Sequence, residues 1–214
     1  MCSPVLAPGG LLFCVVDGGT SDGGDGEDSE ASGGQCEQNE IITLDAQTLQ
    51  FRHRFGLGLL NDAGQLAVVA DELFVCDTGN HRLQVFSLTG EHRRSVTGPW
   101  RSPERLCFAK DRLYLVEREY DGGGDGGGDG DGGGDGGGGG GDDTDVSQEA
   151  ALRRRRILVL SLQGDVLQVV MHPTEPTAVF TSICCFDHKL LATYYHCVDS
   201  AGTRSYEMLA LQGL

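Results

Sequence analysis

The sequence predicts an all-β protein built from four copies of one small antiparallel unit. Three observations lead to this fold class. A hairpin pattern recurs without gaps, further strands follow it at regular distances, and the period is constant once two Gly-rich insertions are set aside. A chain of 214 residues is long enough for one domain of this kind.

The recurring hairpin consists of two short apolar strands joined by a polar turn. Three segments align position for position: LAVVADELFV (66–75), LCFAKDRLYL (106–115) and ICCFDHKLLA (183–192). The segment VLAPGGLLFCVV (5–16) fits the same pattern less closely. Asp71, Asp111, Asp187 and His188 stand in the middle of their copies, where turn-forming residues are expected.

A third strand is predicted after each hairpin, starting at Ile41, Leu83, Ile157 and Met208. These starts lie 42, 74 and 51 residues apart, and allowing for the insertions leaves a period of 40–43 residues. Fourth strands are predicted at 51–55, 92–96 and 166–171. Four short strands in each such period are the signature of a β-propeller blade. An irregular β-sandwich, the alternative, does not predict gapless copies. We therefore expect blades at about 3–56, 57–98, 99–172 and 173–214.

Two acidic, Gly-rich insertions interrupt this scaffold at 18–38 and 120–149. They hold 15 of the 32 acidic residues, 23 of the 34 glycines and no basic residue. The rest of the chain carries 17 acids against 16 bases, so the net charge of −16 describes the insertions. We expect both to be disordered, because ordering them would cost conformational entropy with little apolar burial in return. A nearly neutral scaffold also argues against a generally basic nucleic-acid binder.

The second copy carries a recognisable motif. Residues 75–90 read VCDTGNHRLQVFSLTG and resemble the NHL repeat, which is named after an Asn-His-Leu type of core. The matching motif positions are Asp77, Gly79, Asn80, His81 and Arg82. The third copy keeps an acid–arginine pair, Glu117 and Arg156, whereas the first and fourth copies have Glu40 and Glu207 at the arginine position. The resemblance implies a propeller and covers one copy by motif and the others by period.

These motif residues have a structural interpretation and a functional one. Gly79 and Asn80 suit a tight turn because both tolerate a positive φ. Asp77 and Arg82 flank that turn closely enough to pair across it, and Glu117 and Arg156 would do the same. We expect such pairs to fix the strand connection and the contact with the next blade. The alternative is a ligand-binding rim built from His81 and Arg82.

Two groups of residues are candidates for partner binding. The first is the basic cluster of Arg153, Arg154 and Arg155, which continues into Arg156. It would neutralise the preceding acidic insertion, with a phosphate or RNA contact and a nuclear-import patch as alternatives. The second group lies around the sole tryptophan: Trp100, Arg101 and Arg105. Trp100 is either a binding residue or a rim residue packed under its loop.

The sequence contains no recognisable catalytic motif, and we expect no cofactor, no metal and no enzymatic activity. The eight cysteines form no Cys-x-x-Cys pair and no zinc-type spacing with histidine, so we interpret them as small buried hydrophobes in a reducing compartment. No basic region precedes the apolar run at 11–16, and no run is long enough to span a membrane. We expect a cytoplasmic protein, with a nuclear location as the alternative.

The predicted function is that of a non-catalytic scaffold for a protein partner. The resemblance implies the substrate-recognition part of a ubiquitin-ligase-type assembly, although no RING or B-box cysteine pattern is present. Two alternatives stay open: a metal-dependent lyase or hydrolase of the propeller class, and RNA binding through a basic face. Four blades are few for a ring of about four to eight. We therefore expect an open or incomplete arc that associates with itself or is completed by further blades.

Overall fold

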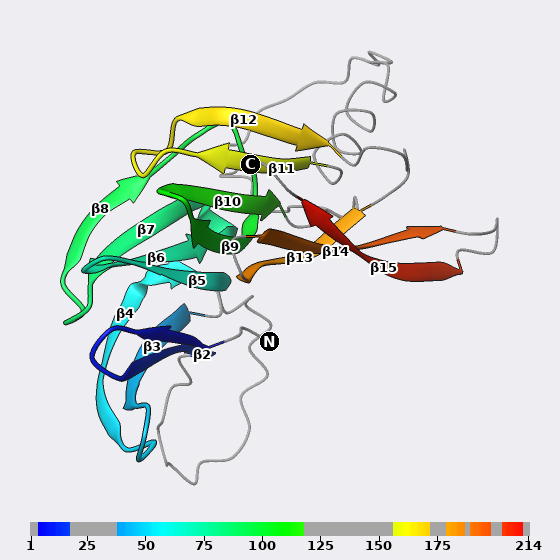
Figure 1. The fold of residues 1–214 in the computed structure, drawn as a ribbon. Coiled ribbons are helices and arrows are strands. Elements are labelled where there is room, and N and C mark those ends of the chain that lie inside the picture. Colours follow the sequence, from blue (N-terminus) through cyan, green and yellow to red (C-terminus); the bar gives the residue numbers. More distant parts are fainter. Residues whose placement is uncertain are drawn as a thin grey trace, which may run out of the picture.

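The computed structural model describes residues 4–17, 38–117, 156–171, 179–186, 189–197 and 203–211. These residues form four antiparallel sheets, each with its strands hydrogen-bonded in chain order (Figure 1). Three sheets have four strands and the last has three. The predicted all-β propeller fold is therefore confirmed, and we number the sheets blades 1 to 4 along the chain.

The strands have the following bounds. Blade 1 comprises β1 (Val5–Ala7), β2 (Leu11–Asp17), β3 (Gln38–Asp45) and β4 (Phe51–Asn61). Blade 2 comprises β5 (Ala63–Val69), β6 (Glu72–Asp77), β7 (Arg82–Ser87) and β8 (His92–Val96), with the 3₁₀ turn η1 (Thr78–Asn80) between β6 and β7. Blade 3 comprises β9 (Pro103–Ala109), β10 (Arg112–Glu117), β11 (Arg156–Leu160) and β12 (Val166–Met171). Blade 4 comprises β13 (Val179–Phe186), β14 (Lys189–Cys197) and β15 (Arg204–Leu211). No helix in the described part of the chain is long and apolar enough to cross a membrane.

The turns of the hairpins follow the predicted chemistry. Lys110 and Asp111 both have a positive φ, 49° and 60°, which matches a two-residue turn between twisted antiparallel strands. Gly90 and Gly164, with φ of 92° and 97°, lead into the fourth strands of blades 2 and 3. Glycine adopts this conformation without steric cost, so both turns are encoded locally.

The outer strand of blade 1 is longer than the sequence pattern predicts. The expected strand ends at residue 55, whereas β4 continues to Asn61 and pairs there with Gln38. Gly56 and Gly58 have φ of 87° and 78°, and the register shifts between Asn39 and Ile41. The two glycines therefore allow a bulge that carries the strand past a point where the pattern indicates a break.

Three apolar cores hold the blades together, and each lies at the contact between two neighbouring blades. We call the face of a blade that packs on the next blade its front face, and the face that packs on the preceding blade its rear face. Phe13 and Ile41 of blade 1 meet Leu73 and Phe86 of blade 2 in the first core. The second core joins blades 2 and 3 and the third joins blades 3 and 4. Strands buried on both faces explain why β6 and β10 read as nearly continuous apolar runs.

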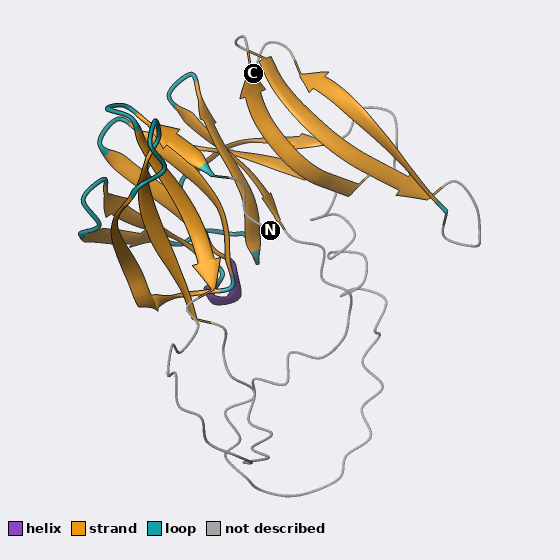
Figure 2. Ribbon diagram, turned by 90° about the horizontal axis from the view of Figure 1, so that it is seen from below, coloured by secondary structure: helices purple, strands orange, loops and turns teal. Residues whose placement is uncertain are grey.

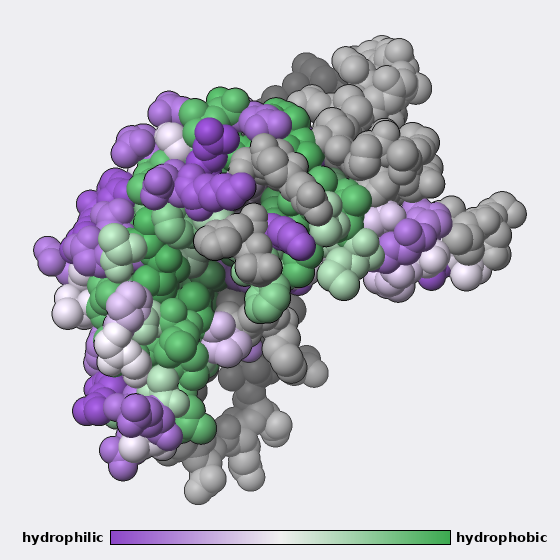
Figure 3. Space-filling view, in the orientation of Figure 1, coloured by the Kyte–Doolittle hydropathy of each residue, from purple (hydrophilic) through white to green (hydrophobic). Residues whose placement is uncertain are grey.

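The four blades form an open arc. Contacts run from β1 and β2 to β5, from β5 to β9 and from β9 to β13, so the first strands line the inner side of the arc. In the described residues, no buried apolar cluster joins blade 4 to blade 1. Figure 2 shows blade 4 extending away from the other blades, and Figure 3 shows apolar residues along the middle of the arc with polar ones over the outer turns.

Both Gly-rich insertions join the second and third strands of a blade. Residues 18–37 and 118–155 lie outside the described residues, so the expected disorder of 18–38 and 120–149 stays a prediction. The strands that they connect are direct hydrogen-bonded neighbours, with Asp17 opposite Asn39 and Leu115 opposite Leu158. A short connection could therefore close the same pair of strands.

We expect deletion of residues 121–143 to leave the fold intact. β10 and β11 pair through their own backbone, and shortening a loop changes the closure entropy by only about 1 kcal/mol. Circular dichroism and the melting temperature should match those of the full chain within a few degrees. A large fall in melting temperature would show that the insertion contributes to the packed structure.

Candidate functional site

A buried carboxylate organises the turn of the NHL-like motif in blade 2. The side chain of Asp77, at the end of β6, is 0% exposed. Its oxygens accept hydrogen bonds from the backbone N–H of Asn61 at 2.8 Å and from Nε of Arg82 at 2.7 Å. Nδ2 of Asn80 at 3.0 Å and Nε2 of Gln84 at 3.3 Å also donate to it. Asp77 therefore joins three segments of the chain: the one that enters the blade, the turn and the third strand.

Blade 3 repeats this arrangement with a longer acid. Glu117, at the end of β10, accepts a hydrogen bond from the backbone N–H of Arg101 at 2.8 Å and from Nε of Arg156 at 2.9 Å. In both blades the arginine also donates through Nη2 to a carbonyl oxygen two residues earlier in the entering segment, that of Leu59 or Pro99. We call this set of contacts the carboxylate clamp. The structure thus brings the predicted pairs together, Asp77 with Arg82 and Glu117 with Arg156.

His81 connects blade 2 to blade 3. Its Nδ1 accepts a hydrogen bond from the backbone N–H of Ser102 at 3.0 Å, directly before β9 begins. Next to it, Oγ1 of Thr78 donates to the carbonyl oxygen of Pro103 at 2.7 Å. His81 itself has a left-handed φ of 55°. Its acceptor nitrogen is therefore occupied by the neighbouring blade, which favours the structural interpretation over the ligand-binding rim.

In blade 1, Asn39 connects the blade to the next one as His81 does in blade 2, and it was not identified from the sequence. Oδ1 of Asn39 accepts a hydrogen bond from the backbone N–H of Ala63 at 2.6 Å, at the start of the next blade. Glu40 pairs with Val16 as Arg82 pairs with Asp77, and Asn39 and His81 directly precede them, so the two acceptors occupy equivalent positions in their blades. A comparison of the copies at this position, rather than at the arginine alone, could have found it.

The turn residues Gly79 and Asn80 act differently from the prediction. Neither has a positive φ; they lie in the 3₁₀ turn, and the left-handed residue is His81. A Cβ on Gly79 would lie 2.7 Å from Cγ of Asn61, closer than any real contact. Glycine is therefore required because the entering segment passes against the turn, and Asn80 is required because its amide binds Asp77.

The partner-binding interpretation of Trp100 is wrong. Trp100 is 3% exposed and belongs to the core between blades 2 and 3, where Gly98 packs against its ring. Arg101 is exposed, but its backbone is held by Glu117. Arg105 donates from Nε to the carbonyl oxygen of Thr181 at 3.1 Å and thereby links blade 3 to blade 4. Of this group, only Arg101 presents an exposed side chain.

The basic residues of the described part are largely neutralised. The basic cluster Arg153, Arg154 and Arg155 lies outside the described residues. On the outer strands four arginines pair with acids: Arg52 with Asp45, Arg54 with Glu40, Arg93 with Asp71 and Arg94 with Glu72. The hydrogen bonds from Arg94 hold the pKa of Glu72 below its usual value. These pairs leave little unbalanced positive charge on the described outer surface.

A pair of thiols lies at the contact between blades 3 and 4. Sγ of Cys107 and Sγ of Cys185 are 3.3 Å apart. Their hydrogen bond and burial both raise the pKa of Cys107. The same hydrogen bond lowers the pKa of Cys185, against the opposing effect of burial. Cys76 is buried as predicted, but Cys184 is exposed, so the interpretation of the cysteines as buried hydrophobes fails there.

The described residues offer no clear place for a metal or a substrate. No group of three or more metal-ligating side chains occurs among them. The inner strands β1, β5, β9 and β13 carry no histidine, and Glu104 is the single acid in their sequences. A pocket beside Cys185 and Lys189 has a volume of about 10 Å³. That is room for about one water molecule, far below the roughly 300–1,000 Å³ typical of ligand pockets.

We expect the Asp77→Ala variant to lose stability, because it removes the carboxylate that accepts from the backbone N–H of Asn61 and from Nε of Arg82. The cost should be about 1–3 kcal/mol in the free energy of unfolding, measured by chemical denaturation. Asp71→Ala, which removes an exposed acid from an ion pair, is the matched control and should change stability little. Equal stability of the two variants would contradict the clamp.

We expect the Trp100→Ala variant to be destabilised by about 3–5 kcal/mol, because a large ring is removed from a packed core. Trp100→Phe should lose much less stability than Trp100→Ala, because an aromatic ring stays in the core. If Trp100→Ala instead keeps its unfolding midpoint, the ring does not contribute to the contact between blades 2 and 3.

Comparisons with known proteins agree with this architecture. The sequence pattern of the NHL repeat matches residues 60–86. No protein with a curated description matches the chain. The segment 60–86 contains the clamp residues Asn61, Asp77 and Arg82, and Leu59, whose carbonyl oxygen accepts from Arg82, lies directly before it.

Solved structures of propellers resemble the chain at low identity. A luciferin-regenerating enzyme matches with 14% identity and a TM-score of 0.56, over 99% of this chain and 61% of that one. The WD40 repeats of RRP9 match with 10% identity and a TM-score of 0.50, over 96% and 49%. BamB from Moraxella catarrhalis matches with 12% identity and a TM-score of 0.48, over 89% and 39%. The chain thus spans less than two thirds of the length of each, and at these identities the likeness concerns the fold. The four sheets and the match to the NHL repeat identify the chain as a four-blade β-propeller that contains an NHL repeat in its second blade.

Proposed function

We propose that this propeller is a non-catalytic binding scaffold for a protein partner. The observation that carries the proposal is that the polar residues of the repeat motif are engaged inside the protein. Asp77, Arg82 and His81 bind backbone groups of the entering segment or of the next blade. They are therefore committed to the fold, and binding must use other surfaces of the blades and loops.

Exposed apolar residues supply such a surface on the outer strand of blade 1. The side chains of Phe51, Leu57 and Leu59 on β4 are exposed, as is that of Leu49 just before it. Large apolar side chains grouped on one exposed segment are typical of protein interaction sites. β4 is also the edge strand of its sheet, so the outer backbone groups that the clamp does not use, those before Leu59, are available for pairing with an extended segment of a partner.

Two alternatives receive less support from the described residues. A propeller lyase or hydrolase needs ligands gathered on the inner side of the arc, and the inner strands supply mainly apolar side chains. RNA binding rests mainly on residues 153–155, because four arginines of the outer strands are paired with acids: Arg52, Arg54, Arg93 and Arg94. The recognition part of a ubiquitin-ligase-type assembly is the narrower form of our proposal, and a cytoplasmic location goes with it.

Affinity capture with the full chain from the source cell tests the proposal. We expect at least one protein to be retained in stoichiometric amount and to be lost when Leu57 and Leu59 are both replaced by Asp. The variant with both Leu167 and Val169 replaced by Asp, which introduces the same charge at exposed residues on the outer strand of blade 3, should retain it. If neither variant changes the set of bound proteins, the surface on β4 is not the binding site.

The same preparation distinguishes the alternatives. Co-purification of a ubiquitin ligase, with ubiquitin on the retained partner, would support the narrower proposal. A stoichiometric metal in the purified chain would favour the enzyme instead. Bound RNA whose affinity falls steeply with salt would favour the nucleic-acid function.

A further inference from the structure

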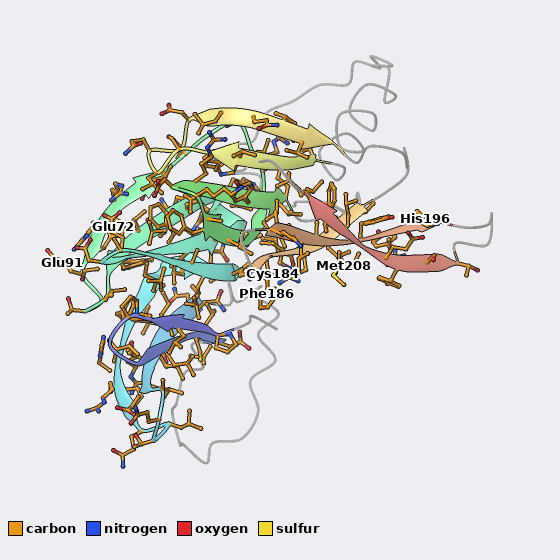
Figure 4. All side chains as sticks on the ribbon, in the orientation of Figure 1. Glu72, Glu91, Cys184, Phe186, His196 and Met208 are labelled. Atoms are coloured by element: carbon orange, nitrogen blue, oxygen red, sulfur yellow. The ribbon has the colours of Figure 1, made fainter. Side chains whose placement is uncertain are left out.

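The front face of blade 4 is built like a blade contact, and no blade covers it within the described residues. Phe186 occupies the position of Val69 in blade 2, and Met208 occupies the position of Leu83. Val69 and Leu83 are 6% and 0% exposed because blade 3 covers them, whereas Phe186 and Met208 are 72% and 67% exposed. Cys184, Phe186 and Met208 project on the same side of blade 4 (Figure 4).

The rear face of blade 1 is the matching half of such a contact. Leu6 lies opposite Leu12 on the neighbouring strand, as Cys185 lies opposite Leu190 in blade 4. Leu190 is buried and Cys185 packs against the core between blades 3 and 4. In blade 1 Leu6 is 62% exposed and Leu12 is partly exposed. Ile42 and Leu44 continue this apolar surface along β3 and are also partly exposed.

We propose that the front face of blade 4 binds the rear face of blade 1 of a second copy of this chain. The two faces have the residue pattern of the contacts that already join blades 1 to 2, 2 to 3 and 3 to 4. One chain carries both halves, so the contact is head to tail. Two four-blade arcs joined in this way twice form a closed ring of eight blades, which is within the range of known propellers. This inference goes beyond the proposed function, because it concerns the ends of the arc and not the surface on β4.

The contact between blades 3 and 4 predicts which residues meet. There Cys107 on the front face of blade 3 lies 3.3 Å from Cys185 on the rear face of blade 4, sulfur to sulfur. In the proposed contact Cys184 takes the place of Cys107, and Leu6 of the second copy takes the place of Cys185. A cysteine introduced at position 6 should therefore lie next to Cys184 of the other copy.

Disulfide cross-linking of the Leu6→Cys variant tests this register. Mild oxidation with glutathione disulfide converts the two thiols into one disulfide and releases two molecules of reduced glutathione. We expect a covalent dimer from Leu6→Cys and its loss in the Leu6→Cys, Cys184→Ser double variant. The unmodified chain controls for the other cysteines. A dimer that persists in the double variant, or none in Leu6→Cys, would overturn the proposed contact.

Sedimentation of the full chain at micromolar concentration tests the assembly without cross-links. We expect a two-copy species that Phe186→Asp weakens by roughly tenfold or more, because a large side chain no longer becomes buried on association. Leu167→Asp, at an exposed apolar residue on β12, should leave the two-copy species unchanged. A monomeric wild-type chain would overturn the proposal, and a ladder of larger species would overturn the closed ring. Both variants keep an intact β4, so a failure here is distinct from a failure of partner binding.

Discussion

The contact between successive blades is the constraint on which the rest of this structure depends. A single meander of four short strands cannot bury its own apolar faces, so each blade packs on a neighbour. The chain meets this need with cores at each contact and with polar groups that fix the segment entering the blade. Asp77 and Glu117 hold that segment against the turn and the third strand, while Asn39 and His81 bind the start of the next blade.

Disruption of the carboxylate clamp is expected to lower the free energy of unfolding strongly, because the carboxylate is buried. A carboxylate without partners would be costly at the position of Asp77, which is fully shielded from water. Backbone N–H, amide and guanidinium donors surround it and offset that cost. The same donors would lose their acceptor if the acid were removed. The clamp therefore favours the one backbone conformation in which the entering segment, the turn and the third strand meet at Asp77. This accounts for a motif that is confined to a few polar positions in an otherwise apolar repeat.

The ends of the arc follow from the same constraint. Blades 2 and 3 are covered on both faces, whereas blade 1 lacks a preceding neighbour and blade 4 a following one in the described residues. Their unpaired faces carry Leu6 and Phe186, which are more exposed than the equivalent residues of the inner blades. Because all blade contacts are built alike, the two uncovered faces can bind further blades, either of a second copy or of another chain segment. Charge plays a smaller part, since the outer arginines are balanced by neighbouring acids.

The sequence by itself determined the strands, the turns and the period, because these depend on the alternation of side chains and on local turn chemistry. It also predicted that Asp77 pairs with Arg82 and Glu117 with Arg156, since each pair flanks one strand connection. Only the tertiary structure decided the environment of residues that meet another blade. Trp100 is buried because blades 2 and 3 close around it, and Gly79 is required because Asn61 passes against it. Cys184 is exposed although it has the same local pattern as Cys107, because a blade covers the front face of blade 3 and none covers that of blade 4 in the described chain.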